Sequence, residues 1–212
     1  MLKKYFQLNT WVILSLILMT ELIYNIVIKT YLFSDKVVYN SLAEQLTLEQ
    51  INTALVGIRS NTVLIFFLAL LQPLAEIGLI TVCIAVGTLL FKYNVTFKQV
   101  FGVVVKSFFI FTLSRLPIFV GLVFFDVEKF GDLNYIPQFS LAEWFGETSI
   151  PPWSLYPMQL LNIFQLGFIL LLTAGFNLLD HRGFGKWFVL TLCTYGVGLA
   201  IMVILTGFFI TL

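Results

Sequence analysis

Residues 62–91 read TVLIFFLALLQPLAEIGLITVCIAVGTLLF, thirty residues in which Glu76 is the single charged side chain. The hydrocarbon core of a bilayer is about 30 Å thick, and a helix that rises ~1.5 Å per residue needs about 20 apolar residues to cross it. This stretch is therefore long enough to span a membrane as one α-helix. A strand of a membrane barrel would be shorter and would alternate apolar with polar residues, unlike this stretch.

Four other stretches have the same character. The five predicted spans are 11–28, 62–91, 103–125, 158–179 and 187–212. The overall composition agrees, because 59% of the 212 residues are hydrophobic and 11% are charged, against about 25% charged residues in a soluble protein. The net charge of +1 offers no basic surface for nucleic acid. We expect an all-α integral membrane protein, a single polytopic domain built as a bundle of five transmembrane helices.

Basic residues are distributed unequally between the two sides of this predicted bundle. One side carries seven of them, namely Lys3, Lys4, Lys92, Lys98, Lys106, Arg182 and Lys186. The other side carries four, namely Lys29, Lys36, Arg59 and Lys129. Cytoplasmic loops of membrane proteins are enriched in Lys and Arg. The pattern therefore predicts an N-terminus inside and a C-terminus outside.

The predicted outer loops are longer than the inner turns. In the first outer loop, Ser41 and Glu44 match a capping box, and apolar residues follow at helical spacing. We expect residues 41–59 to form an amphipathic helix at the outer interface. The second outer loop, residues 126–157, contains several Pro, Trp and Tyr residues, which is typical of an irregular segment anchored at the headgroups.

Three ionisable residues lie within the predicted spans: Glu21, Glu76 and Arg115. Counting along each helix places all three near the middle of the bilayer, where a charge costs about 2.5–3.5 kcal/mol. Opposite charges at one depth lower each other's desolvation cost. We therefore predict one intramembrane charge cluster made of these three side chains.

Polar residues and prolines extend this predicted layer. The supporting polar residues are Gln72, Asn25, Ser114, Asn162 and Gln165. Pro73 and Pro117 lie close by and are expected to kink their helices. Two interpretations stay open: an ion-pair network that fixes the register of the bundle, or a proton- or cation-coupled transport site in which Glu76 titrates. A helix broken at Pro73 would favour transport, whereas a simple kink would favour a scaffold.

Patterns of an enzyme or of a metal site are missing from the sequence. There is no Walker loop, zinc motif or Gly-x-Ser-x-Gly elbow. The two cysteines, Cys83 and Cys193, lie in separate apolar runs and do not indicate a disulfide framework. We expect no catalytic residues, no metal and no cofactor.

A further pattern extends from residue 61 to residue 212. The second span carries Gln72-Pro73-Leu74 and ends in Gly87-Thr-Leu-Leu-Phe-Lys. The third is entered through Thr96-Phe-Lys-Gln-Val-Phe-Gly-Val-Val-Val-Lys-Ser and contains Leu116-Pro117. Asn162-Ile-Phe opens the fourth, and a basic turn with Arg182 and Lys186 precedes the last. In these features the chain resembles the Yip family of five-span, Rab-interacting membrane proteins, in particular its small bacterial members.

The resemblance implies a five-helix bundle with the N-terminus inside, no catalysis, and a role in organising membrane partners or lipids. Eukaryotic members carry a cytosolic N-terminal segment for trafficking partners, whereas about ten residues precede the first span here. We therefore expect a multi-pass protein of a bacterial cytoplasmic membrane, or of an endomembrane if the source is eukaryotic. Its expected partners are the lipid bilayer, other membrane proteins or a second copy of the chain. The charges suggest an alternative function, a small proton- or cation-coupled transporter or channel component.

Overall fold

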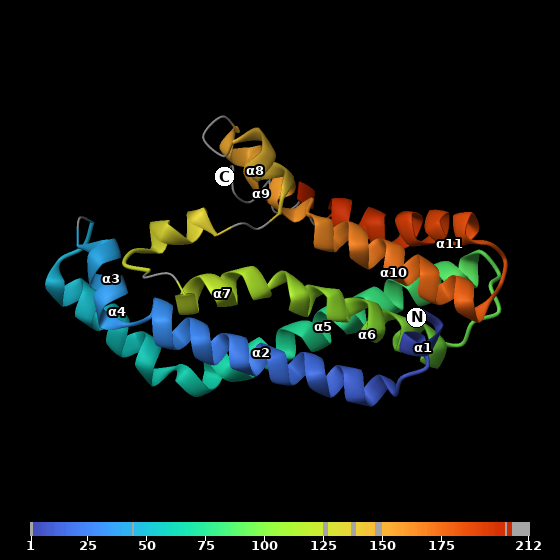
Figure 1. Cartoon of the computed structure of the whole chain (residues 1–212), viewed down its shortest axis with the longest axis horizontal. Helices are drawn as coiled ribbons and strands as arrows, with labels where there is room; N and C mark the ends of the chain where they lie inside the picture. The colour runs from blue at the N-terminus through green and yellow to red at the C-terminus, as the bar shows by residue number, and fades with distance from the viewer. Residues whose placement is uncertain are drawn as a thin grey trace.

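The computed structural model of the chain describes residues 2–43, 45–124, 127–136, 139–146, 150–201 and 203–204. Within these ranges the regular structure is helical and no β-strand occurs. An elongated bundle (Figure 1) is formed by α2 (Thr10–Leu32), α5 (Thr62–Leu90), α6 (Phe97–Ser114), α7 (Leu116–Phe124), α10 (Ile163–Leu179) and α11 (Phe184–Thr191), which the π-helical turn η3 (Leu192–Gly196) continues. The remaining elements are α1 (Leu2–Phe6), α3 (Asp35–Leu42), α4 (Leu48–Ser60), the 3-10 helix η1 (Phe130–Tyr135), α8 (Leu141–Phe145) and α9 (Pro152–Leu160).

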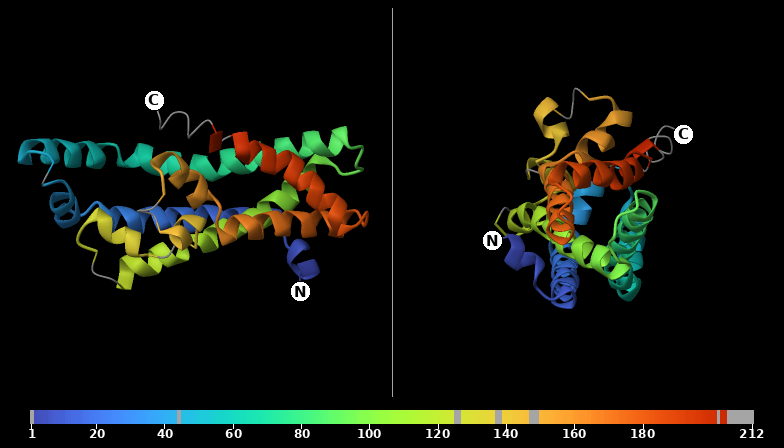
Figure 2. Two further views of the ribbon diagram at one scale, coloured as in Figure 1. Left: turned by 90° about the horizontal axis from the view of Figure 1, so that it is seen from above. Right: turned by 90° about the vertical axis from the view of Figure 1, so that its right-hand side faces the viewer.

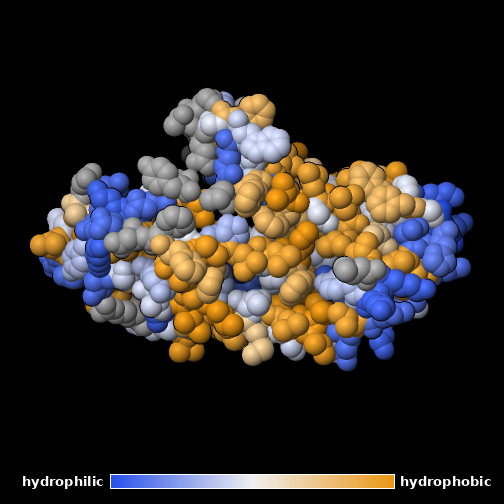
Figure 3. Space-filling model, in the orientation of Figure 1, coloured by the Kyte–Doolittle hydropathy of each residue, from blue (hydrophilic) through white to orange (hydrophobic). Residues whose placement is uncertain are grey.

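Four helical segments are long and apolar enough to cross a membrane. They are Thr10–Leu32, Thr62–Leu90, Phe97–Phe124 and Phe184–Ile201. Helix α10 is also apolar but has only 17 residues. On the face shown in Figure 3, hydrophobic residues gather over the middle of the bundle and hydrophilic residues gather toward its two ends. The predicted all-α class is confirmed, and the four segments are compatible with an integral membrane protein.

The helix boundaries differ from the predicted spans where polar residues cap the helices. The third membrane segment begins at Phe97 rather than at 103, because Thr96 and Gln99 form a capping box at its start. Helix α10 begins at Ile163 rather than at 158, because the Asn162 side chain accepts a hydrogen bond from the Gln165 N–H. The end of the predicted fifth span, residues 205–212, lies outside the described residues.

Two helices, α3 and α4, occupy the region where one amphipathic helix over 41–59 was predicted. The capping box that starts α4 is formed by Thr47 and Gln50, and the predicted partner Glu44 lies outside the described residues. Asn61 alone separates α4 from α5. Helix α4 therefore prolongs α5 beyond the end of the bundle rather than lying across it (Figure 2), and a small cluster of Val38, Ile51 and Leu55 joins it to α3.

Helix α6 packs against α2, α5 and α10, so it lies at the centre of the bundle. Its Val100, Val104 and Phe108 are buried, as are Phe168 of α10 and Trp187 of α11. Helix α5 and the η3 turn approach each other closely at Gly87, because this residue has no Cβ. A Cβ at Gly87 would overlap the γ-methyl group of Thr194 in η3. Gly87 follows Cys83 by four residues, and this spacing of two small residues permits a close approach between helices.

The N-terminal helix α1 folds back against α6. The Tyr5 hydroxyl donates to the Lys106 carbonyl at 2.6 Å, and Lys106 Nζ donates to the Phe6 carbonyl at 2.8 Å. Burial raises the pKa of Tyr5 to about 12. Helix α1 lies at the same end as the α5–α6 and α10–α11 turns (Figure 1). The segments that carry the seven basic residues therefore share one end.

Candidate functional site

The structure joins two of the three predicted intramembrane charges in an ion pair. Arg115 Nη1 contacts Glu21 Oε2, and the Glu21 side chain is only 4% exposed. Glu21 lies eleven residues from either end of α2 (Thr10–Leu32), which is about 16 Å at ~1.5 Å per residue. The pair is therefore central along α2. An ion pair at this depth stabilises both charges, because either one alone would be desolvated without compensation.

A break in the third membrane segment positions Arg115. Helix α6 ends at Ser114 with Arg115 as its C-cap, and α7 begins at Leu116. Pro117 has no N–H to donate to the Leu113 carbonyl, and its ring would clash with that carbonyl in a continuous helix. Pro117 was predicted to kink its helix, and the structure shows an interruption of the helix at Arg115, two residues before it. The Arg115 side chain extends from this break.

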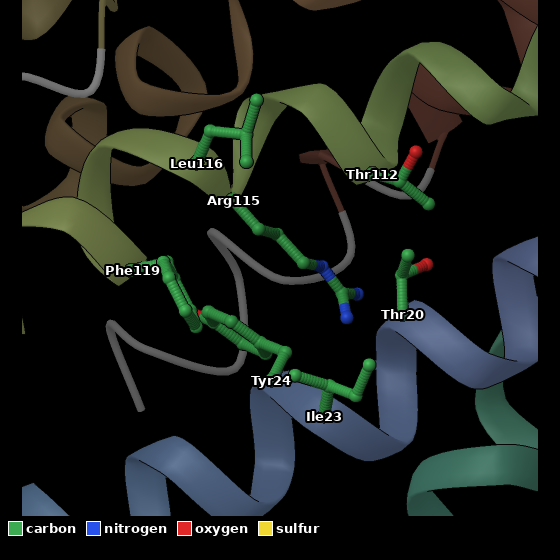
Figure 4. Close-up of a pocket in the computed structure, with 7 residues that line it drawn as sticks. All are labelled: Thr20, Ile23, Tyr24, Thr112, Arg115, Leu116 and Phe119. Carbon is green, nitrogen blue, oxygen red and sulfur yellow. The ribbon is translucent and has the colours of Figure 1, made fainter.

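Arg115 extends from the break into a groove between α2 and the α6–α7 segment. The groove has a volume of about 190 Å³ and is open on one side. Its lining residues are Thr20, Ile23, Tyr24, Thr112, Arg115, Leu116 and Phe119. The guanidinium points toward α2 and ends near Tyr24 and Thr20 (Figure 4), with Arg115 Cζ 5.0 Å from the centre of the Tyr24 ring. The Arg115 side chain is 29% exposed, so part of it faces this space.

Both threonines of the groove use their hydroxyl hydrogens within their own helices. Thr20 donates to the carbonyls of Leu16 and Ile17 at 2.9 and 2.8 Å, and Thr112 donates to the Phe109 carbonyl. A hydroxyl oxygen that donates in this way keeps lone pairs that can accept hydrogen bonds. The groove therefore presents guanidinium donors and hydroxyl acceptors between otherwise apolar walls.

Two of the predicted supporting residues are bonded to their own helices. Asn25 donates to the Glu21 carbonyl at 2.9 Å, and Ser114 donates to the Phe111 carbonyl at 2.8 Å. Such side-chain bonds to the preceding turn satisfy polar groups inside a membrane segment without a partner helix. Within the described part of the chain, the hydrogen bonds of Asn25 and Ser114 therefore stay inside their own helices, although both residues lie beside the charged pair in sequence.

Glu76 is placed differently from the other two charges. It lies on the exposed surface of α5, where Gln72 Nε2 donates to Glu76 Oε1 at 2.9 Å. Among the described residues it forms no ion pair with a basic side chain. The predicted cluster of three charges is thus a pair, Glu21 and Arg115, with Glu76 apart from it. Helix α5 also runs without interruption through Pro73.

A second polar contact links α10 to the last helix. Gln165 is buried, and its side-chain nitrogen donates to the Tyr195 hydroxyl in the π-helical turn. Asn162 supports this contact by capping the helix that carries Gln165, with Oδ1 2.8 Å from the Gln165 N–H. Helix α5, which carries Glu76, packs against this turn. The predicted residues Gln165 and Asn162 therefore belong to this second contact rather than to the ion pair.

Several residues of these two sites were not predicted as site residues, among them Thr20, Tyr24, Phe119 and Tyr195. Tyr24 follows Glu21 by three residues, a spacing that places both on one side of a helix. That signal was available in the sequence. The groove itself depends on how α2 crosses the broken α6–α7 segment, which no local pattern specifies.

The charged pair can hold two helices together and can offer spare donors to a bound molecule. No group of three potential metal ligands occurs among the described residues. Comparisons of the chain with protein-family models, curated proteins and solved structures found no match.

Proposed function

We propose that this chain is a non-enzymatic, Yip-like membrane protein of five spans, whose rigid bundle organises lipids and membrane partners. The observation that carries the proposal is the Glu21–Arg115 pair. It ties the middle of α2 to the break between α6 and α7. A contact of this kind specifies register between helices, which is the property a scaffold requires.

In this proposal α10 is the span that adds to the four longer apolar segments. Its 17 residues extend about 25 Å at ~1.5 Å per residue, and a span slightly shorter than the hydrocarbon core is accommodated at modest cost. Helix α10 packs between α6 and α11. The N-terminus is inside in this proposal, because the segments that carry the seven basic residues meet at one end. A bacterial cytoplasmic membrane is the proposed location.

The alternative is proton- or cation-coupled transport through Glu76. It is favoured by the packing of α5, which carries Glu76, against the η3 turn, whose Tyr195 contacts the buried Gln165. The continuous course of α5 through Pro73 supports the scaffold instead, because transport sites at this depth are typically built on broken helices. We therefore place transport second.

Reconstitution into liposomes separates the two functions. We expect proton and cation flux equal to that of empty liposomes, and the same flux for Glu76→Gln. Flux above that background which Glu76→Gln abolishes would overturn the scaffold in favour of transport.

The five-span topology is tested separately with single cysteines at Lys129 and Arg182. A membrane-impermeant thiol reagent should label the first from outside and the second only from inside. Labelling of both positions from one side would refute five spans.

A further inference from the structure

We propose that the groove at Arg115 binds the carbonyl group of an uncharged lipid that enters from the bilayer. The inference rests on the proposed function and gives its lipid a chemical class. It is carried by the donors that Arg115 exposes to the groove, by the charge balance of the pair, and by the depth of the site.

The donors of Arg115 outnumber their partners. A guanidinium has five N–H groups, and within the described residues Arg115 has Glu21 and the ring of Tyr24 as its partners. Water does not satisfy such groups in the hydrocarbon core, and each unpaired donor is costly there. An acceptor that reaches the groove would therefore gain more from a hydrogen bond than it would at the surface of the membrane.

The charge of the bound molecule follows from the ion pair. Glu21 already neutralises Arg115. A carboxylate or phosphate ligand would bring an uncompensated negative charge beside the buried Glu21, and a cationic ligand would bring a second positive charge beside the guanidinium. A neutral carbonyl oxygen accepts from the guanidinium without changing the net charge, and this favours a ketone, a quinone or an ester.

The depth of the groove specifies where the molecule comes from. The site lies about 16 Å from either end of α2, near the centre of a hydrocarbon core about 30 Å thick. The charged headgroup of a phospholipid would have to leave the interface to reach it. A lipid quinone or a diacylglycerol has no charged headgroup and can sink to this depth, while its tails remain in the bilayer at the open side of the groove.

The test measures binding to the full chain in nanodiscs, with thermal unfolding and the intact mass of the complex as readouts. The probes are a decyl-substituted benzoquinone and a diacylglycerol, with palmitate as the anionic and hexadecane as the carbonyl-free comparison. We expect one copy of a carbonyl probe to bind, with a rise in Tm, and no saturable binding of palmitate or hexadecane. The probe of the two that binds more tightly identifies the source of the carbonyl group.

Groove-filling variants make the test specific. Ile23→Trp fills the groove from a residue that is 52% exposed and leaves both charged side chains in place, so we expect affinity to fall at least tenfold. Ile26→Trp on the same helix is the control, because Ile26 is 53% exposed and does not line the groove. Leu116→Trp provides a second obstruction from the other wall. Equal binding by the wild type and both obstructed variants would overturn the proposal.

The outcomes also separate this inference from the proposed function. If neither carbonyl probe binds, and Arg115→Ala still destabilises the protein, the lipid-binding inference fails and the proposed scaffold function stands. Tight binding of palmitate would show that the site accepts anions and would likewise overturn the inference.

Discussion

Two glutamates lie deep in apolar helices of this protein, and their surroundings are opposite. Glu21 of α2 is buried and paired with Arg115. Glu76 of α5 is exposed on the bundle and contacts Gln72 of its own helix. A carboxylate is buried between helices here where a neighbouring helix supplies a cation. For Glu21 of α2 this cation is Arg115, which lies at the break before Pro117. Pro73 produces no such break in α5, so a similar sequence element has two structural outcomes.

The largest effect is expected when Glu21 loses its partner. Arg115→Ala leaves a buried, unpaired carboxylate, and we expect a loss of about 3–5 kcal/mol in stability. Unfolding in detergent, followed by intrinsic fluorescence, measures it. Adding Glu76→Gln to Arg115→Ala should give no rescue, because Glu76 does not contact Arg115. Rescue by Glu76→Gln would mean that all three charges form one cluster.

An intermediate effect is expected where α5 packs closely against η3. Gly87→Ala places a Cβ against the γ-methyl group of Thr194, and such overpacking costs about 1–3 kcal/mol. Thr194→Ser removes that methyl group, so the double variant should regain most of the loss. Gly78→Ala is the matched control on the same helix, because nothing lies within 4 Å of a Cβ there. Equal stability of Gly87→Ala and Gly78→Ala would contradict the close packing of α5 on η3.

Lys106 provides a third case, since its side chain donates to the Phe6 carbonyl rather than to a carboxylate, and its own carbonyl accepts from the Tyr5 hydroxyl. Tyr5→Phe removes the hydrogen bond to the Lys106 carbonyl, and we expect a loss of about 0.5–1.5 kcal/mol. The pKa of Tyr5 is raised from 10.0 to about 12 on folding, so the folded state holds this proton more tightly. The contribution of Tyr5 is therefore full below pH 10 and lost as the pH rises toward 12. Unfolding measured from pH 9 upward should show a decline that Tyr5→Phe reduces.

The smallest effect is expected at Glu76 itself. Glu76→Gln keeps an acceptor for Gln72 on an exposed surface, and we expect a change within about 0.5 kcal/mol. Thermal unfolding in nanodiscs measures it beside Glu21→Gln, which should be several times more destabilising. Comparable losses in the two variants would remove the distinction between the two glutamates.

The depth of the charged residues could be predicted from the sequence. The direction in which each helix turns its polar side chains could not. Counting residues gives the depth of a charge, so Glu21 and Arg115 were expected at one level. The same count placed Glu76 there as well. However, α5 is apolar on every side, and its pattern does not reveal which face meets a neighbour. Tyr195 could not be connected with Gln165 for the same reason, because their contact depends on the packing of α10 against the last helix.

The central claim is that Glu21 and Arg115 stabilise each other inside the bundle. A double-mutant cycle with Glu21→Gln, Arg115→Gln and the double variant measures it most directly, as free energies of unfolding in nanodiscs. The two single variants should each be strongly destabilised and the double variant should recover part of the loss, with a coupling energy of about 1–3 kcal/mol. Additive losses, with a coupling energy near zero, would contradict the ion pair and the scaffold built on it.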